Sequence, residues 1–379
     1  MSDAPISELD FLRKLQRLLN EGDFVATYKF ALLNALADLS LEHALAADGS
    51  LRVAVRDIAE KFIEYYWRQA RPYRALDGKG FVLLQNSGKQ AAVVNAVVRY
   101  QSEHATLAVA RAARGWHGLV ARITATVAEM PLWKLQTVGS EADEFLYRRS
   151  EFANGTVRLL PGVPAAFRAL HALVLDAVRG AWIRQINTIG SNRAVLGESD
   201  LALFLFGTDR STLARFASAL RAHQGSRCMY CRREVKGVGD VDHFIAWSRY
   251  PADLGFNLAL SHRLCNAKKR DFLAHPAHLE SWHRSHVERA GDLAQRFEAA
   301  KLPHDLERTQ AVVWWAYEQG EAAGAHAWMR DDQFERLGAG WRDAMSSFEL
   351  PRVAEPAPVP WVARGDLDKR GTGPETTDV

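Results

Sequence analysis

The chain of 379 residues contains 48% hydrophobic and 25% charged residues, an ordinary globular composition that excludes a wholly disordered protein and allows two or three compact units. The net charge of +3 is too small to indicate a nucleic-acid partner. Its distribution is uneven, because residues 221–270 carry ten Lys and Arg against four Asp and Glu, which makes this block +6 and the remainder −3.

No window reaches the ~18 uninterrupted apolar residues of a membrane span, and the first residues lack the basic and apolar regions of a signal peptide. We therefore expect a soluble, cytoplasmic protein without a membrane partner. The three cysteines cannot pair completely, and in a reducing compartment their spacing favours metal binding over disulfides.

Apolar residues recur at helical spacing through most of residues 1–220. The pattern predicts a first helix that ends near Gly22, a second that runs through Leu39, and a third whose stripe extends from Leu51 to Tyr66. It predicts further helices at about 105–128 and from Pro164 to about Asn187, with a connection over 138–163. We interpret residues 1–220 as a helical region that binds a target, a partner or nucleic acid.

The third predicted helix ends in a segment, residues 65–74, in which aromatic residues alternate with three arginines. Such a segment can hold phosphates and stack on bases. It can equally place its aromatics in the core and its arginines in solvent. Both interpretations stay open.

Residues 276–350 predict a C-terminal helical region, with helices over 277–300, 305–322 and 331–346. Residues 351–379 contain five prolines and few large apolar residues, which is typical of a disordered tail.

All three cysteines lie in the block between these regions. Cys228 and Cys231 form a Cys-x2-Cys pair, and 31 residues after Cys231 the pair His262-x2-Cys265 follows. Three thiolates and one imidazole in two tight pairs are typical of a structural, tetrahedral zinc site. His275 is a rival fourth ligand but lacks the paired spacing with a cysteine.

Between the pairs, residues 241–244 and 257–260 predict two short strands, and residues 262–272 a helix. A unit this small cannot bury enough core alone, so a metal would stabilise it. The sequence thus predicts a mainly α protein, α+β overall, with a small ββα-metal module at residues 221–275.

The module resembles the HNH endonuclease superfamily, in the version that ends in Asn. The resemblance rests on the order Cys-x2-Cys, Asp242-His243, Asn257 and His262-x2-Cys265-Asn266-x2-Lys269, and covers about 45 residues. A general similarity extends to bacterial proteins that carry such a module after a helical N-terminal region.

The resemblance implies a role for each motif residue. His243 would be the general base, and Asn257 would hydrogen-bond the neighbouring loop and orient that base. Asp242 and Asn266 would bind a catalytic Mg²⁺ or Mn²⁺. Lys268, Lys269, Arg270 and Arg249 could contact phosphates, although Arg249 could equally only support its loop.

We therefore expect a metal-dependent endonuclease acting on DNA, with RNA also open, in bacterial defence or restriction. One alternative is a zinc-stabilised nucleic-acid-binding module without hydrolysis. Another is a nuclease effector that a partner protein or signal ligand licenses through the helical region. The oligomeric state is not predicted.

Overall fold

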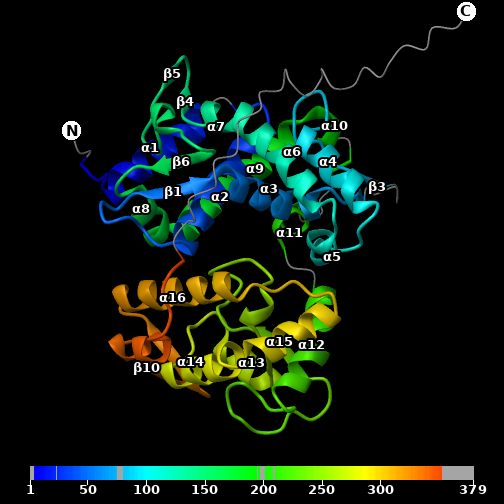
Figure 1. Cartoon of the computed structure of the whole chain (residues 1–379), viewed down its shortest axis with the longest axis vertical. Coiled ribbons are helices and arrows are strands. Elements are labelled where there is room, and N and C mark those ends of the chain that lie inside the picture. Colours follow the sequence, from blue (N-terminus) through cyan, green and yellow to red (C-terminus); the bar gives the residue numbers. More distant parts are fainter. Residues whose placement is uncertain are drawn as a thin grey trace, which may run out of the picture.

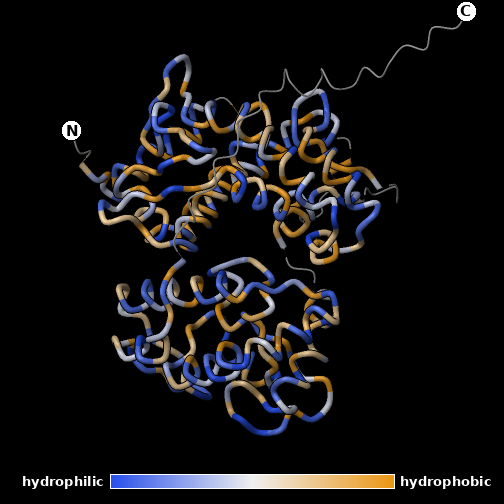
Figure 2. The backbone as a smooth tube through the Cα atoms, in the orientation of Figure 1, coloured by the Kyte–Doolittle hydropathy of each residue, from blue (hydrophilic) through white to orange (hydrophobic). Residues whose placement is uncertain are grey.

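The computed structural model describes residues 4–22, 24–74, 80–193, 195–196, 201–207 and 210–351. Two lobes lie one above the other along the long axis (Figure 1). One holds the elements up to residue 207, the other those from residue 210 onward, and each has its own cluster of buried apolar residues. Figure 2 shows hydrophobic residues along the inner helices of both lobes. Of the predicted tail, residues 352–379 lie outside the described residues.

The first lobe is helical with three small antiparallel two-stranded sheets among its described residues. Its helices are α1 (Glu8–Glu21), α2 (Tyr28–Glu42), α3 (Val55–Gln69), α4 (Ala92–Gln101), α5 (Leu107–Ala112), α6 (Trp116–Glu129), α7 (Pro131–Lys134), η1 (3₁₀, Arg149–Glu151), α8 (Val163–Ala169), α9 (His171–Thr188), α10 (Gly190–Arg193) and α11 (Leu201–Phe206). Its strands are β1 (Leu51–Ala54), β2 (Tyr73–Arg74), β3 (Gly80–Phe81), β4 (Thr137–Val138), β5 (Glu141–Ala142) and β6 (Thr156–Leu159).

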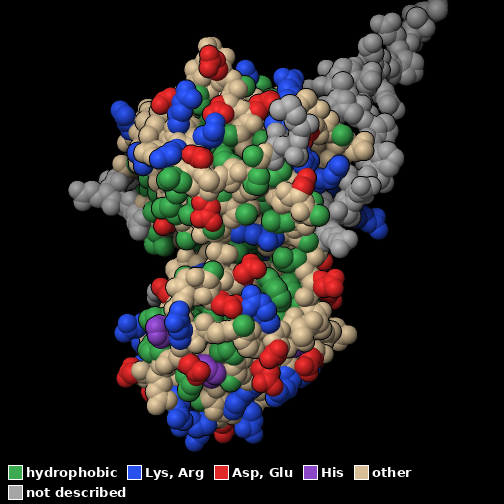
Figure 3. All heavy atoms as spheres, turned by 90° about the vertical axis from the view of Figure 1, so that its left-hand side faces the viewer, with side chains coloured by type: hydrophobic (Ala, Val, Ile, Leu, Met, Phe, Trp, Pro, Cys, Tyr) green, Lys and Arg blue, Asp and Glu red, His purple; other side chains and the backbone are tan. Residues whose placement is uncertain are grey.

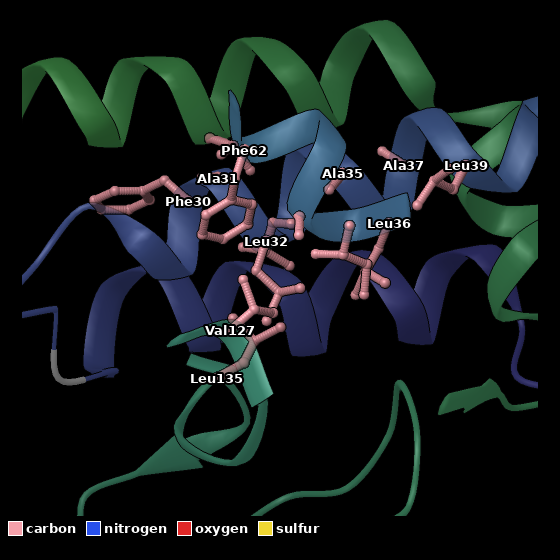
Figure 4. Packing of buried hydrophobic residues seen from close by; sticks show 14 of the residues in the cluster. Phe30, Ala31, Leu32, Ala35, Leu36, Ala37, Leu39, Phe62, Val127 and Leu135 are labelled. Atoms are coloured by element: carbon pink, nitrogen blue, oxygen red, sulfur yellow. The ribbon is translucent and has the colours of Figure 1, made fainter. Parts of the chain in front are cut away.

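Helix α2 is the centre of this lobe. Every residue from Lys29 to Glu42 is buried, as expected for a helix that is apolar around most of its circumference. Phe30, Leu32 and Leu36 point into a cluster that includes Phe62 of α3 and Leu135 (Figure 4). Helices α3, α7, α8 and α9 pack against α2, and α4, α6 and α11 pack against α3.

Three predictions for this lobe are wrong. Residues 51–54 form strand β1 rather than the start of the third helix, since Leu51 and Val53 pair with Leu159 and Val157 of β6. Residues 138–163 are accordingly more than a connection, because they contain β6. The helix predicted from Pro164 onward is two helices, α8 and α9, divided at Leu170.

The second lobe begins with α12 (Arg210–His223). It continues with β7 (Asp240–His243), η2 (3₁₀, Gly255–Asn257), β8 (Leu258–Ser261), α13 (Arg263–Lys269), α14 (Pro276–Trp282), η3 (π-helix, His283–Val287), α15 (Ala290–Ala299), α16 (Leu306–Ala322), β9 (His326–Arg330), β10 (Gln333–Arg336) and η4 (3₁₀, Ala339–Met345). Strands β7 and β8 and helix α13 form the predicted ββα unit, so the protein is mainly α and α+β overall, as the sequence predicts.

The helices after the ββα unit share its core. Phe244 stacks on Trp282 of α14, and the indole N–H of Trp282 donates to the carbonyl oxygen of Phe256. The prediction of one helix over 331–346 is wrong. This segment contains β10, which forms a hairpin with β9, and then η4. Trp328 of the hairpin is buried, and the buried rings of Tyr317 and Trp341 lie with 5.7 Å between their centroids.

Helix α16 faces the first lobe (Figure 1). Its Arg308 is buried and forms ion pairs of 3.0 Å with Glu42 of α2 and 2.8 Å with Glu64 of α3. The indole N–H of Trp315 donates to the carbonyl oxygen of Arg168. Charged and aromatic groups of α16 thus set how the lobes meet.

Candidate active site and metal centre

The four predicted zinc ligands come together. One ligand atom from each of Cys228, Cys231, His262 and Cys265 lies within 4.8 Å of the others. The first pair belongs to the loop before β7 and the second to the junction of β8 and α13. The set is a Cys3His cluster of the zinc type, which clips the two ends of the ββα unit together.

The backbone around the cluster fixes its geometry. Arg232 follows the first pair with φ +62°, and its amide donates to the carbonyl oxygen of Cys228, which closes a tight turn. His262 Nε2 donates to the carbonyl oxygen of Glu234, so that Nδ1 lies 3.2 Å from the sulfur of Cys231. The hydrogen bond with Cys265 lowers the pKa of the Cys228 thiol, although burial acts against this, and the thiolate form binds metals.

Strand β7 presents the Asp-His pair. It pairs antiparallel with β8, with Asp242 opposite Ala259 and His243 opposite Leu258. Successive strand residues point to opposite faces, so Asp242 and His243 have different surroundings. Gly239 precedes the strand with φ +71°, and a Cβ there would lie 2.7 Å from Val235 and 2.9 Å from Leu260.

His243 is 7% exposed, and its Nε2 lies 3.0 Å from Oδ1 of Asp253. The ring of Trp247 packs beside it, with 5.4 Å between ring centroids. Within the described part of the chain, Nδ1 of His243 takes part in no hydrogen bond. The histidine is therefore oriented through one nitrogen and retains the other.

Asp242 is held from two sides. Its Oδ2 accepts a hydrogen bond from the hydroxyl of Tyr230 and lies 3.2 Å from the ammonium of Lys269. The same ammonium donates to the carbonyl oxygen of His243 at 2.9 Å, so one buried cation links both motif residues. Burial, followed by the charge of Asp242, raises the pKa of Tyr230 well above its usual value, so the phenol stays a donor.

The two asparagines have separate environments. Asn257 is fully buried, and its side chain accepts from the amide and donates to the carbonyl oxygen of Ile245, which fixes the loop after His243. Asn266, on α13, donates through Nδ2 to Oδ2 of Asp240 at 3.2 Å. Asp240 thereby joins Asp242 on one side of β7, next to Asn266.

The four basic residues differ in accessibility. Lys268 pairs with Asp332 at the surface, and Arg270 is exposed at the end of α13. Arg249 donates to the carbonyl oxygen of Asp271 and so supports its loop. Lys269 is fully buried and faces Asp242 instead of solvent. Elsewhere, Lys and Arg side chains gather at the far end of the second lobe in Figure 3.

Two contributing residues were not predicted from the sequence, Asp253 and Tyr230. Asp253 lies ten residues after His243, in a loop whose path no local pattern determines. Tyr230 stands inside the first cysteine pair, and it joins the metal cluster to Asp242. The only feature of the sequence that pointed to this role of Tyr230 was the position of an aromatic residue between two ligands.

A family model for the HNH endonuclease matches residues 228–272, the segment that contains the Cys3His cluster, Asp242, His243 and Asn266. The second lobe therefore carries an HNH endonuclease domain. A family model described as a domain of unknown function, DUF8808, matches residues 8–203, more than half of the chain. The protein belongs to this family.

No curated protein and no solved structure matches the chain. In the described ranges, none of the helices combines the length and apolar character needed to cross a membrane.

Proposed function

We propose that this protein is a metal-dependent endonuclease that hydrolyses phosphodiester bonds in DNA. The observation that carries the proposal is the contact of 3.0 Å between His243 and Asp253, inside a segment that matches the HNH endonuclease family. A carboxylate that holds one imidazole nitrogen leaves the other to exchange a proton with a reacting group.

The roles of these two residues follow from their hydrogen bond. If Nε2 carries the proton and donates it to Asp253, Nδ1 is unprotonated and can take a proton from water. Asp253 is a positioning residue that fixes the ring and its tautomer. Asn257 holds the backbone at Ile245, two residues beyond the base.

The donor set on the other side of β7 suits a hard divalent cation. Among the described residues, Asp242 contacts Tyr230 and Lys269 through Oδ2 alone, and Asn266 contacts Asp240 through Nδ2 alone. A carboxylate and an amide oxygen, Oδ1 of Asp242 and Oδ1 of Asn266, therefore remain to hold Mg²⁺ or Mn²⁺. Such an ion, when bound, would stabilise negative charge on the phosphate and on the leaving oxygen.

We propose Zn²⁺ for the Cys3His cluster, since thiolate and imidazole ligands suit this ion and a closed four-ligand set is structural. We further propose a bacterial defence or restriction role, in which the first lobe receives the partner or ligand that controls cutting. An endonuclease acting without control would damage its own host's DNA.

Cleavage and binding can be separated with Asp242→Ala. The parent protein should cut plasmid with Mg²⁺ and stop when EDTA is added. Asp242→Ala should lose cleavage while still shifting DNA in a gel, and the exposed Asp343→Ala should behave as the parent. A parent protein that binds DNA and cuts it with no divalent ion would instead be a nucleic-acid-binding module.

A further inference from the structure

A cavity of about 310 Å³ lies where the two lobes meet. Its walls come from α2, α3, α5, α9 and α11 of the first lobe and from α12, the loop over residues 247–254 and the start of α16 in the second. Trp67, Arg68 and Arg71, from the segment whose meaning the sequence leaves open, belong to these walls. The segment therefore faces a cavity rather than only core and solvent.

The acidic groups of the cavity are already paired. Glu64 binds Arg308 and Arg111, and Asp38 lies 2.9 Å from His171. Asp253 is held by His243, and the side chain of Asp305 accepts from the first turn of α16. Each of these acidic side chains thus already has a partner within the protein, and Glu64 is paired with two cations.

Three lining arginines have no such partner. Arg71, Arg179 and Arg215 form no ion pair or side-chain hydrogen bond with any residue in the described ranges, and Nε of Arg179 is buried without a hydrogen-bond acceptor. Arg179 lies over the ring of Phe206, 5.2 Å from its centroid. Burial lowers the pKa of Arg179, which reflects a cation kept partly from water, and an anionic ligand would offset that cost.

The cavity also contains an unsatisfied neutral group. Asn34 of α2 is 2% exposed and lines the wall, and its Oδ1 has no hydrogen-bond partner. A buried polar atom without a partner is costly, and in native proteins it usually meets a ligand or water. The side chains of Trp67, Trp247 and Phe206 also line the cavity, and aromatic side chains pack well against a planar group.

We propose that this cavity binds one nucleotide unit, with its phosphate on Arg179, Arg71 and Arg215 and its base among the aromatic walls near Asn34. The volume is at the lower end of small-ligand sites, about 300–1,000 Å³. A free nucleotide and a nucleotide of a bound strand share this chemistry. The site needs no cleavage and so goes beyond the proposed nuclease function.

The cavity adjoins the candidate active site. Asp253 and Trp247 line it, and both contact His243. Oδ1 of Asp253 lies 3.0 Å from Nε2 of His243, and the ring centroids of Trp247 and His243 are 5.4 Å apart. A ligand in the cavity would therefore contact the groups that orient the base. Because the walls come from both lobes, the same ligand would also bridge them.

The test uses the full-length parent protein without added divalent ion, so that nothing is cut and the pair of Asp253 and His243 stays intact. AMP, inorganic phosphate, adenosine and a short single-stranded oligonucleotide are titrated by calorimetry. We expect AMP or the oligonucleotide to bind, and Arg179→Met or Arg215→Ala to weaken binding about 10-fold or more. Arg184→Ala, on an exposed turn of α9, is the matched control, and melting temperatures identify any unfolded variant.

The titrated compounds distinguish a free nucleotide from a nucleotide of a bound strand. Binding of AMP as tight as that of the oligonucleotide identifies a free nucleotide, and binding of the oligonucleotide alone identifies a strand. No binding, or binding that the exposed Arg215→Ala leaves unchanged, overturns the inference. Plasmid cutting by the parent is measured on the same preparation after Mg²⁺ is added. A protein that cuts but binds no nucleotide contradicts only the cavity proposal, whereas a protein that binds but does not cut contradicts only the nuclease proposal.

Discussion

At the residue scale, the candidate site depends on side chains that hold other side chains. Asp253 orients His243, Lys269 links Asp242 to the backbone of His243, and Tyr230 joins Asp242 to the metal cluster. The motif residues are predictable because their order and spacing are local. Their supporting residues are not, because Asp253 meets His243 only once the loop over residues 244–257 has folded.

Asp253→Asn tests the positioning role. An amide is a weaker acceptor than a carboxylate, so the imidazole loses orientation and kcat should fall about 10- to 100-fold with KM little changed. Steady-state cleavage of a labelled oligonucleotide measures both constants. Asp253→Glu should recover part of kcat, and Asp343→Asn is the surface control. An unchanged kcat in Asp253→Asn would show that the contact is only structural.

At the element scale, the ββα unit shows what a short pattern can and cannot predict. Four ligands were predicted from the spacing of cysteines and histidine, and their ligand atoms do converge. Two strands and a helix were predicted from the residues between and after the ligand pairs, and both strands and the helix are present. Residues 51–54 and 331–346 were assigned to helices, because the pattern of apolar residues in a short segment does not distinguish a helix from a strand. Residues 51–54 form a strand because they pair with β6, and the segment after residue 331 begins with a strand because β10 pairs with β9.

Removal of the metal should act on this element first. A strong chelator at pH 7, or Cys265→Ala, should destabilise the ββα unit, because its two strands and one helix bury little surface among themselves and the cluster joins their ends. Near-ultraviolet circular dichroism and metal analysis would follow the loss. The core of the first lobe, which contains none of the ligands, should retain its helical signal. A chelated protein that keeps its full near-ultraviolet spectrum would contradict a structural metal.

At the scale of the whole molecule, buried charges lie where the lobes meet. Arg308 of α16 meets Glu42 and Glu64, and His171 and Lys61 lie around Asp38. Burial alone would raise the pKa of Asp38, but the hydrogen bond from His171 and the charge of Lys61 outweigh it and lower this pKa below its ordinary 3.8. None of these contacts was predictable, since each joins residues far apart in the chain.

This lowered pKa has a consequence for stability. A carboxylate whose pKa is lower in the folded state binds fewer protons than in the unfolded state, so its contribution is complete above about pH 4–5 and is lost as the pH falls below 4. The slope is at most about 1.4 kcal/mol per pH unit. Urea unfolding from pH 5 to pH 2.5 should show a shallower decline for Asp38→Asn than for the parent. The exposed Asp176→Asn is the control, and equal slopes in Asp38→Asn and the parent would contradict this role.

The most direct test of the nuclease itself is cleavage by His243→Ala. Purified parent, His243→Ala and the exposed-histidine control His326→Ala are incubated with supercoiled plasmid, single-stranded DNA and RNA, with Mg²⁺ or with chelator. We predict that the parent and His326→Ala cut DNA only with Mg²⁺, and that His243→Ala cuts at least about 100-fold more slowly. A His243→Ala protein that remains folded and cuts as fast as the parent would contradict the assignment of His243 as the base.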